Sequence, residues 1–104
     1  SVVEMILDLV RAFRPEEDGA SARVKDTVAW GPGPRAAQAL MLTVRAKALL
    51  DGRLAPSPAD VIDMAEPVLS HRMALNFAAR ARDDSLAALI RDTAGQVTGA
   101  EAAA

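Results

Sequence analysis

Residues 34–51 carry the densest pattern of hydrophobic positions in the chain. Placed on a helix at about 100° per residue, these positions form two stripes separated by polar residues. The first stripe consists of Ala37, Leu40, Met41, Val44 and Ala48, and the second of Ala39, Leu42, Ala46, Leu49 and Leu50. A surface helix usually shows one apolar stripe, so two stripes predict neighbours on both sides. We therefore expect residues 34–51 to form the central helix of a small bundle.

Residue types at both ends of this segment give the limits of the helix. Pro34 suits the first helical position, because its φ is already helical and its missing N–H is not needed there. Gly33 then occupies the N-cap position. Gly52 follows the last turn, where a helix commonly ends in a left-handed residue. The predicted helix therefore covers residues 34–51.

Three further helices are expected to pack around the central one. Residues 2–14 carry apolar side chains at helical spacing. Residues 58–72 carry a second such pattern, which Pro67 should break or kink, because proline removes a backbone hydrogen bond and crowds the preceding turn. Residues 84–97 form the last predicted helix, and residues 98–104 are expected to be a frayed tail.

The segments between these helices predict loops and one aromatic anchor. Residues 15–23 are polar and rich in turn formers, so we expect an exposed loop. Residues 25–30 are expected to be extended, and residues 76–82 to be a connector that could carry helical turns. Trp30 is the only tryptophan. We interpret it as an anchor holding the following Gly-Pro turn against the bundle, with stacking on a ligand as the alternative.

Composition agrees with one small helical domain, which we place at residues 1–97. The chain has 104 residues, and apolar residues make up 51% of them while aromatic residues make up 3%. A core of Leu, Val, Ile, Met and Ala favours helices over sheets, so the predicted fold is an all-α bundle of about four helices. Because the chain opens directly on a helix, we expect it to be a piece of a longer protein.

The N-terminus lacks a signal peptide pattern, and no run of about 18 apolar residues predicts a membrane span. The absence of cysteine fits a reducing compartment, so we expect a cytoplasmic protein.

The residues available argue against several kinds of site. One histidine and no cysteine leave no metal cluster, and no serine, histidine and acid combine into a catalytic triad. The prolines of residues 31–34 remove N–H groups that a phosphate-cradling loop needs, and that turn has no lysine. A net charge of −2 without a basic cluster argues against nucleic-acid binding. We therefore do not expect a free-standing enzyme.

Arg35 is the strongest candidate functional residue. It is expected one step inside the N-terminus of an apolar helix, with Pro34 and Ala36 beside it. Its permanent charge and the positive end of the helix dipole both favour an anion, and phosphate is the natural candidate. A solvated arginine without function is an equally open interpretation.

His71 and Arg72 form a second candidate pair. Cations at the end of a helix interact favourably with the negative end of its dipole, so a cap of the preceding helix is the simpler interpretation. A contact with another domain or subunit is the alternative. Arg45 and Lys47 are interpreted as solvated residues between the apolar stripes.

Four segments carry a resemblance to a known family: residues 30–36 (WGPGPRA), 45–53 (RAKALLDGR), 58–61 (PADV) and 68–72 (VLSHR). Their order and spacing resemble the C-terminal lid of the MoxR-family AAA+ ATPases over residues 2–97. Members often carry serine where this chain has Gly33. The glycine would lose a cap hydrogen bond but keep the turn.

This resemblance implies an αβα core with Walker A, Walker B, sensor 1 and an arginine finger, none of which is in the chain. It implies that Arg35 is the sensor-2 arginine, which reaches the γ-phosphate of ATP held with Mg²⁺ by that core. It also implies a homo-hexameric ring and a chaperone-like role in maturing or assembling other protein complexes.

Two functions of other classes remain open. The chain could be a helical protein-interaction module that uses no nucleotide. A helix-turn-helix nucleic-acid binder is a further alternative, against which the mildly acidic charge argues. A Walker A motif encoded upstream of Ser1 would discriminate the ATPase from both.

Overall fold

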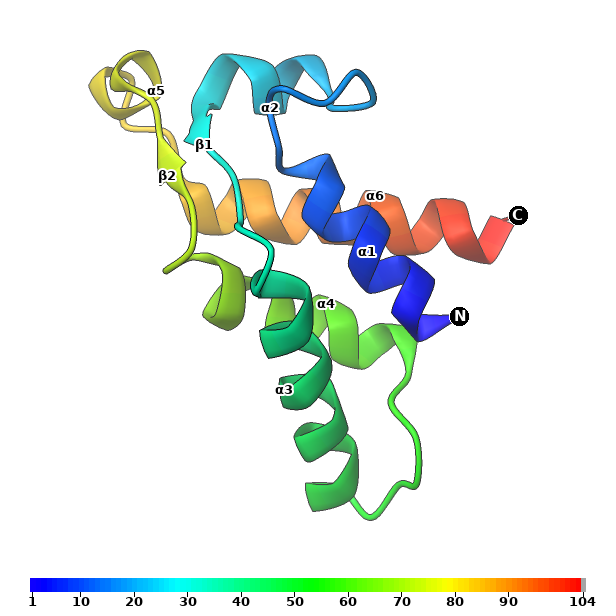
Figure 1. Cartoon of the computed structure of the whole chain (residues 1–104). Coiled ribbons are helices and arrows are strands. Elements are labelled where there is room, and N and C mark those ends of the chain that lie inside the picture. The colour runs from blue at the N-terminus through cyan, green and yellow to red at the C-terminus, as the bar shows by residue number, and fades with distance from the viewer. Residues whose placement is uncertain (104) are drawn as a thin grey trace.

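The computed structural model of this protein describes the backbone of residues 1–103 and the side chains of residues 1–99. Within that part, six helices and two short strands follow one another (Figure 1). The helices are α1 (Val2–Ala12), α2 (Ala22–Thr27), α3 (Ala36–Leu50), α4 (Pro58–Leu69), α5 (Phe77–Ala81) and α6 (Leu86–Ala103). The strands β1 (Val28–Trp30) and β2 (Ala74–Leu75) pair antiparallel. The predicted helical lid-type bundle is confirmed, with two short helices and this strand pair in addition.

The core lies where α1, α3, α4 and α6 meet. α4 packs against all three of the other long helices, and its inward side chains Val61, Ala65 and Leu69 are fully buried. The largest other side chains of the core are Ile6, Leu9, Phe13, Leu40, Leu89 and Ile90. The central helix of the bundle is therefore α4.

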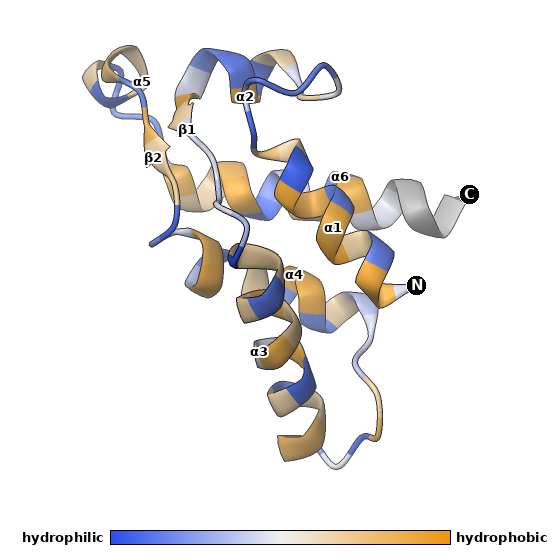
Figure 2. Ribbon diagram, in the orientation of Figure 1, coloured by the Kyte–Doolittle hydropathy of each residue, from blue (hydrophilic) through white to orange (hydrophobic). Residues whose placement is uncertain are grey.

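The prediction that residues 34–51 form the central helix is wrong. The first stripe of α3 faces the bundle, with Leu40 and Val44 fully buried. The second stripe faces solvent: Leu42 is 67% exposed and Leu50 is 88% exposed. α3 projects from the bundle as an arm whose far end is strongly hydrophobic (Figure 2). Apolar periodicity gives the faces of a helix, but it does not tell whether the same chain covers both of them.

The predicted break at Pro67 is also wrong. α4 runs through Pro67, and the N–H of Ser70 still donates to the carbonyl of Glu66 at 3.0 Å. Pro67 lies in the last turn, so its missing N–H interrupts the helix ladder only next to the end of the helix. α4 ends at Leu69, earlier than the predicted residue 72.

Helix ends elsewhere differ from the predictions by a few residues or more. α1 ends at Ala12 instead of residue 14. α6 continues to Ala103 instead of ending near residue 97, so the frayed tail predicted at 98–104 is wrong for residues 98–103, and residue 104 lies outside the described part. Thr98 is buried and its hydroxyl donates to the carbonyl of Ala94 at 2.9 Å, which accommodates a polar side chain within the helix.

The connecting segments contain more helix than the sequence predicts. Residues 15–23 are largely exposed, as predicted, but α2 begins within this segment at Ala22 and ends at Thr27. Only the last three residues of the predicted extended segment, Val28–Trp30, form a strand. Residues 76–82 carry α5. None of the helices in the described part is long and apolar enough to cross a membrane.

Candidate functional site

A tight turn leads the chain into α3 and carries Arg35. The N–H of Ala36 donates to the carbonyl of Gly33 at 3.1 Å, which closes a β-turn with Pro34 and Arg35 at its centre. Arg35 is the N-cap residue of α3, and its carbonyl accepts the N–H of Ala39 at 3.0 Å. α3 therefore begins at Ala36, later than predicted, because Pro34 and Arg35 form the turn itself.

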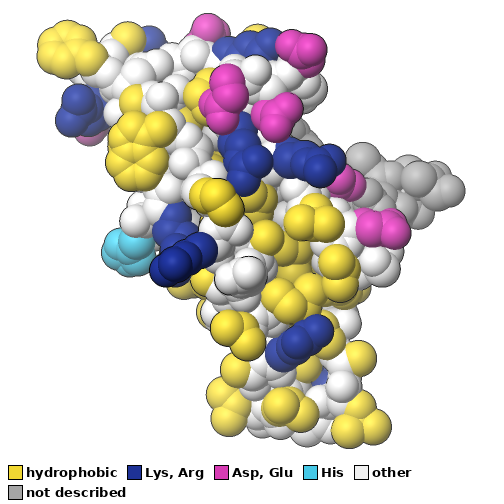
Figure 3. Space-filling model, viewed as in Figure 1, with side chains coloured by type: hydrophobic (Ala, Val, Ile, Leu, Met, Phe, Trp, Pro, Cys, Tyr) yellow, Lys and Arg dark blue, Asp and Glu magenta, His cyan; other side chains and the backbone are white. Residues whose placement is uncertain are grey.

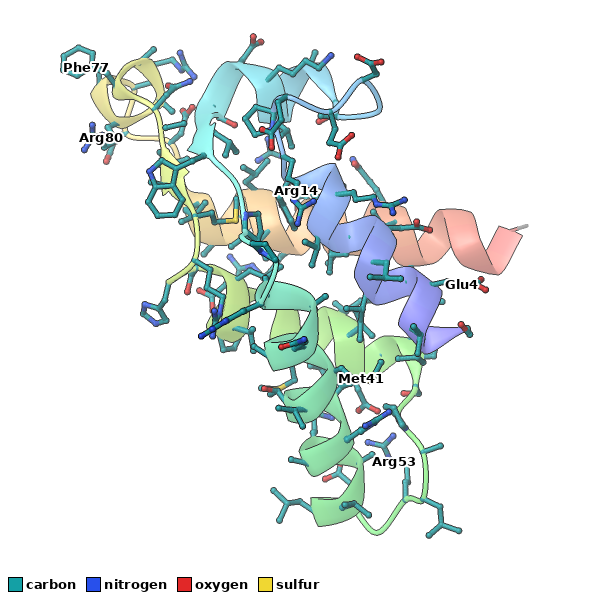
Figure 4. The ribbon with its side chains drawn as sticks, in the orientation of Figure 1. Glu4, Arg14, Met41, Arg53, Phe77 and Arg80 are labelled. Atoms are coloured by element: carbon teal, nitrogen blue, oxygen red, sulfur yellow. The ribbon has the colours of Figure 1, made fainter. Side chains whose placement is uncertain are left out.

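The end of α1 holds this turn in place. A Cβ built on Gly31 would lie 2.4 Å from the carbonyl oxygen of Phe13, so only glycine allows the two backbones to come this close. Arg14 Nε donates to the carbonyl of Pro32 at 3.2 Å, and Figure 4 shows the Arg14 side chain at the end of α1 beside this segment. Arg35 is therefore presented on a backbone that is fixed to the bundle.

Replacing Gly31 with alanine should destabilise the domain by about 1–3 kcal/mol, since the new methyl group forces the turn away from α1. Gly33→Ala is the matched control, because a Cβ on Gly33 meets no atom within 4 Å. Denaturant unfolding followed by circular dichroism measures both free energies. Equal stability of the two variants would show that Gly31 is not closely packed.

The Arg35 side chain is exposed, and none of the ion pairs or side-chain hydrogen bonds between described residues involves it. Arg35 is the N-cap residue of α3, and the leading N–H groups of a helix have no partner within the helix. A guanidinium in this place fits a phosphate oxygen supplied from outside the domain. Pro34 has no N–H, and the N–H of Ala36 is already used, so these two candidates shape the turn and offer no donor.

His71 and Arg72 lie just after α4 and are both exposed. Together with Pro67 and Val68 they form one wall of a shallow hollow, whose other wall is Ala39 and Thr43 of α3. We call this the α3–α4 hollow. The Arg72 backbone N–H donates to the carbonyl of Leu69 at 2.9 Å, but neither side chain caps the helix through a hydrogen bond among the described residues.

Trp30 does not have the predicted anchoring role, because 55% of the residue is exposed. Its position follows from strand pairing, in which Trp30 lies opposite Ala74. No group of three or more His, Asp or Glu side chains that could hold a metal ion is found in the described part.

Sequence reasoning missed a buried ionic cluster at the joint between α3 and α4. Asp60 is only 1% exposed and accepts hydrogen bonds from both terminal nitrogens of Arg53 at 2.7 Å and from Lys47 at 2.8 Å. The backbone N–H of Ser57 donates to it at 2.7 Å, as part of a capping box at the start of α4. Arg53 also pairs with Asp51 at 2.9 Å. The interpretation of Lys47 as a solvated residue is therefore wrong.

This cluster sets the protonation state of Asp60 and ties the two helices together. The Arg53 guanidinium, then the Lys47 ammonium and the Ser57 N–H, hold the pKa of Asp60 well below its usual range. Arg53 lies in the loop that leaves the end of α3 (Figure 4). The Ser-x-x-Asp spacing of residues 57–60 is typical of a capping box and could have been recognised in the sequence. The cationic partners of Asp60 lie outside that motif.

The helical fold is that of a lid domain. Residues 20–93 match the family described as AAA lid domain, and this chain belongs to that family. The chain is similar to the chaperone MoxR1 of Mycobacterium tuberculosis, with 35% identity over 85 residues. That match covers 82% of this chain and 22% of MoxR1.

A solved structure from Cytophaga hutchinsonii, classed as an ATPase, is similar with a TM-score of 0.80 and 30% identity. It covers 88% of this chain and 28% of the Cytophaga protein. The chain therefore spans less than a third of either relative. The predicted relationship to MoxR-type AAA+ lids is confirmed.

Proposed function

We propose that this chain acts as the lid of a MoxR-type AAA+ ATPase and that Arg35 is its sensor for the γ-phosphate of ATP. The observation that carries the proposal is an exposed guanidinium, without a partner among the described residues, on a turn fixed to the bundle. Similarity to a chaperone and to a protein classed as an ATPase supports a parent protein of this class.

Arg35 can distinguish ATP from ADP because only ATP offers the charge of a γ-phosphate. A ligand shifts a conformational equilibrium only by its difference in affinity for the two states, and this contact supplies such a difference. The core domain of the parent would hold ATP, which supplies the phosphoanhydride bond that is hydrolysed, together with Mg²⁺, which would neutralise charge on the phosphates. Arg35 would stabilise negative charge on the transferred phosphoryl group.

The lid can transmit this contact as a rigid body. The turn before α3 is held by Gly31 and Arg14 at the end of α1, and the far end of α3 is tied to α4 through Asp60. A displacement of Arg35 would therefore move the whole bundle as one body, which is the basis of hinge-type domain closure.

The wider function proposed for the parent protein follows from the MoxR resemblance. Closure of the lid would couple ATP hydrolysis to chaperone-like maturation or assembly of other protein complexes. The parent would be a cytoplasmic homo-hexamer, in which this lid associates with its own AAA+ core.

A second candidate is a nucleotide-independent interaction module. It is favoured by the hydrophobic outer face of α3, where Leu42, Leu49 and Leu50 are exposed. The two functions differ in what the gene encodes before Ser1. A Walker A motif, Gly-x-x-x-x-Gly-Lys-Ser/Thr, in the same reading frame is the expected result, and its absence would favour the interaction module.

A further inference from the structure

Most of the lysine and arginine side chains make no ion pair between described residues, so Arg35 and Arg72 are distinguished by their positions and not by the lack of a partner. Four cationic side chains form ion pairs with aspartates: Arg23, Lys47, Arg53 and Arg82. Arg35 and Arg72 are exposed, and no ion pair or side-chain hydrogen bond between described residues includes either of them. Such unpaired charges attract an anion from outside the domain.

Arg72 belongs to the same edge of the molecule as Arg35. The α3 wall of the α3–α4 hollow is formed by Ala39 and Thr43. These residues follow Arg35 by four and eight positions, which places them below it on one face of α3. The opposite wall ends in His71 and Arg72. Figure 3 shows the histidine side chain with two lysine or arginine side chains beside it on this edge.

The two arginines start from different but connected elements. Arg35 is held by the turn before α3. Arg72 is held by the last turn of α4 through its N–H bond to Leu69. α3 packs against α4, and the Asp60 cluster joins the end of α3 to the start of α4, so both side chains originate from one packed pair of helices. A terminal phosphate has three acceptor oxygens and can bind more than one guanidinium.

We propose that Arg72 is a second nucleotide-binding residue of the lid, which binds the same terminal phosphate of ATP as Arg35. This inference rests on the proposed function and deepens it. ATP contacts the lid at the start of α3 and just after α4, and loss of the γ-phosphate frees both helices together. Arg72 lines the hollow between these helices, and Arg35 precedes Ala39 of its α3 wall by one helical turn, so an anion at this end of the hollow would contact both side chains.

Isothermal titration calorimetry of the full-length protein with AMP-PNP, a non-hydrolysable ATP analogue, and with ADP tests this inference. Arg72→Ala should weaken AMP-PNP binding roughly tenfold, since hydrogen bonds between charged groups contribute on this scale. Binding of ADP should change less than about twofold, because ADP lacks the terminal phosphate. Arg80→Ala is the matched control: Arg80 is also exposed, but it lies on α5 (Figure 4), which contributes no residue to the hollow.

The double variant Arg35→Ala/Arg72→Ala should lose less affinity than the product of the single losses, because both residues share one anion. Circular dichroism of each full-length variant checks that the fold is intact. If Arg35→Ala weakens AMP-PNP binding but Arg72→Ala behaves as Arg80→Ala does, the inference fails and the proposed function stands. If Arg35→Ala has no effect, the proposed function fails. A loss of oligomer assembly in Arg72→Ala with unchanged nucleotide affinity would assign Arg72 to a protein contact and overturn the inference.

Discussion

Replacing Arg35 with alanine is expected to lower the ATP turnover of the full-length protein by roughly 10- to 100-fold. The reason is that the variant loses a charged, two-pronged donor to the phosphoryl group, and this contact strengthens as charge develops during transfer. Arg35→Lys should recover only part of the rate, since an ammonium keeps the charge but lacks the planar fork. Steady-state phosphate release measures the ATP turnover of the wild type, Arg35→Ala and Arg35→Lys.

Arg45→Ala provides the control for this experiment. Arg45 is exposed on α3, and it lines the groove between α1 and α3, away from the turn that carries Arg35. Its removal should leave turnover within about twofold of wild type. Because Arg35 is exposed and makes no side-chain contact among the described hydrogen bonds, its removal should also leave thermal stability unchanged. If Arg35→Ala hydrolyses ATP at the wild-type rate, Arg35 is not the sensor for the γ-phosphate.

Replacing Asp60 with asparagine should lower the melting temperature by about 10 °C or more. The substitution removes the charge that Arg53 and Lys47 share at a buried position, and a partly buried cation without its partner is strongly destabilising. It also weakens the capping box at Ser57. Asp63→Asn is the matched control: Asp63 is 58% exposed and lies 3.5 Å from Lys47, so its removal should have little effect. Thermal unfolding gives the melting temperatures of the wild type, Asp60→Asn and Asp63→Asn for comparison.

The same cluster predicts an acid-sensitive stability. The pKa of Asp60 in the folded protein lies below its ordinary value of 3.8, so the folded state binds fewer protons than the unfolded state. The contribution of Asp60 is therefore fully present above pH 3.8 and is lost as the pH falls toward the folded pKa. Wild-type stability should fall in this range, and Asp60→Asn should show a shallower decline. Parallel curves for the two proteins would contradict the role assigned to Asp60.

Sequence periodicity predicted the class of fold and most of the core, but it misplaced the centre of the bundle. The stripe of α3 that contains Leu40 and Val44 is buried, as its spacing predicts. The stripe that contains Leu42 and Leu49 has the same periodicity and is exposed. What distinguishes the two is the path of the chain after α3, which carries α4 back along one side only. Periodicity within one helix contains no information about that path.

The candidate site was predictable where it depends on local chemistry. The Gly-Pro residues before Arg35 predict a turn at the head of a helix, and the structure places one there, with the helix beginning at Ala36. The Asp60 cluster could not be predicted as a whole, because Arg53 and Lys47 lie 7 and 13 residues earlier in the chain. Only the fold of the loop between α3 and α4 brings these cations to one carboxylate.

The central claim, that Arg35 contacts the γ-phosphate of ATP, is tested most directly by a structure of the full-length protein with a bound ATP analogue. The distance from the Arg35 guanidinium to the nearest γ-phosphate oxygen is the quantity to measure. We expect about 2.7–3.0 Å, the range of a charge-assisted hydrogen bond. A lid in which Arg35 points into solvent, or pairs with a carboxylate of the core while other residues bind the γ-phosphate, would contradict the account.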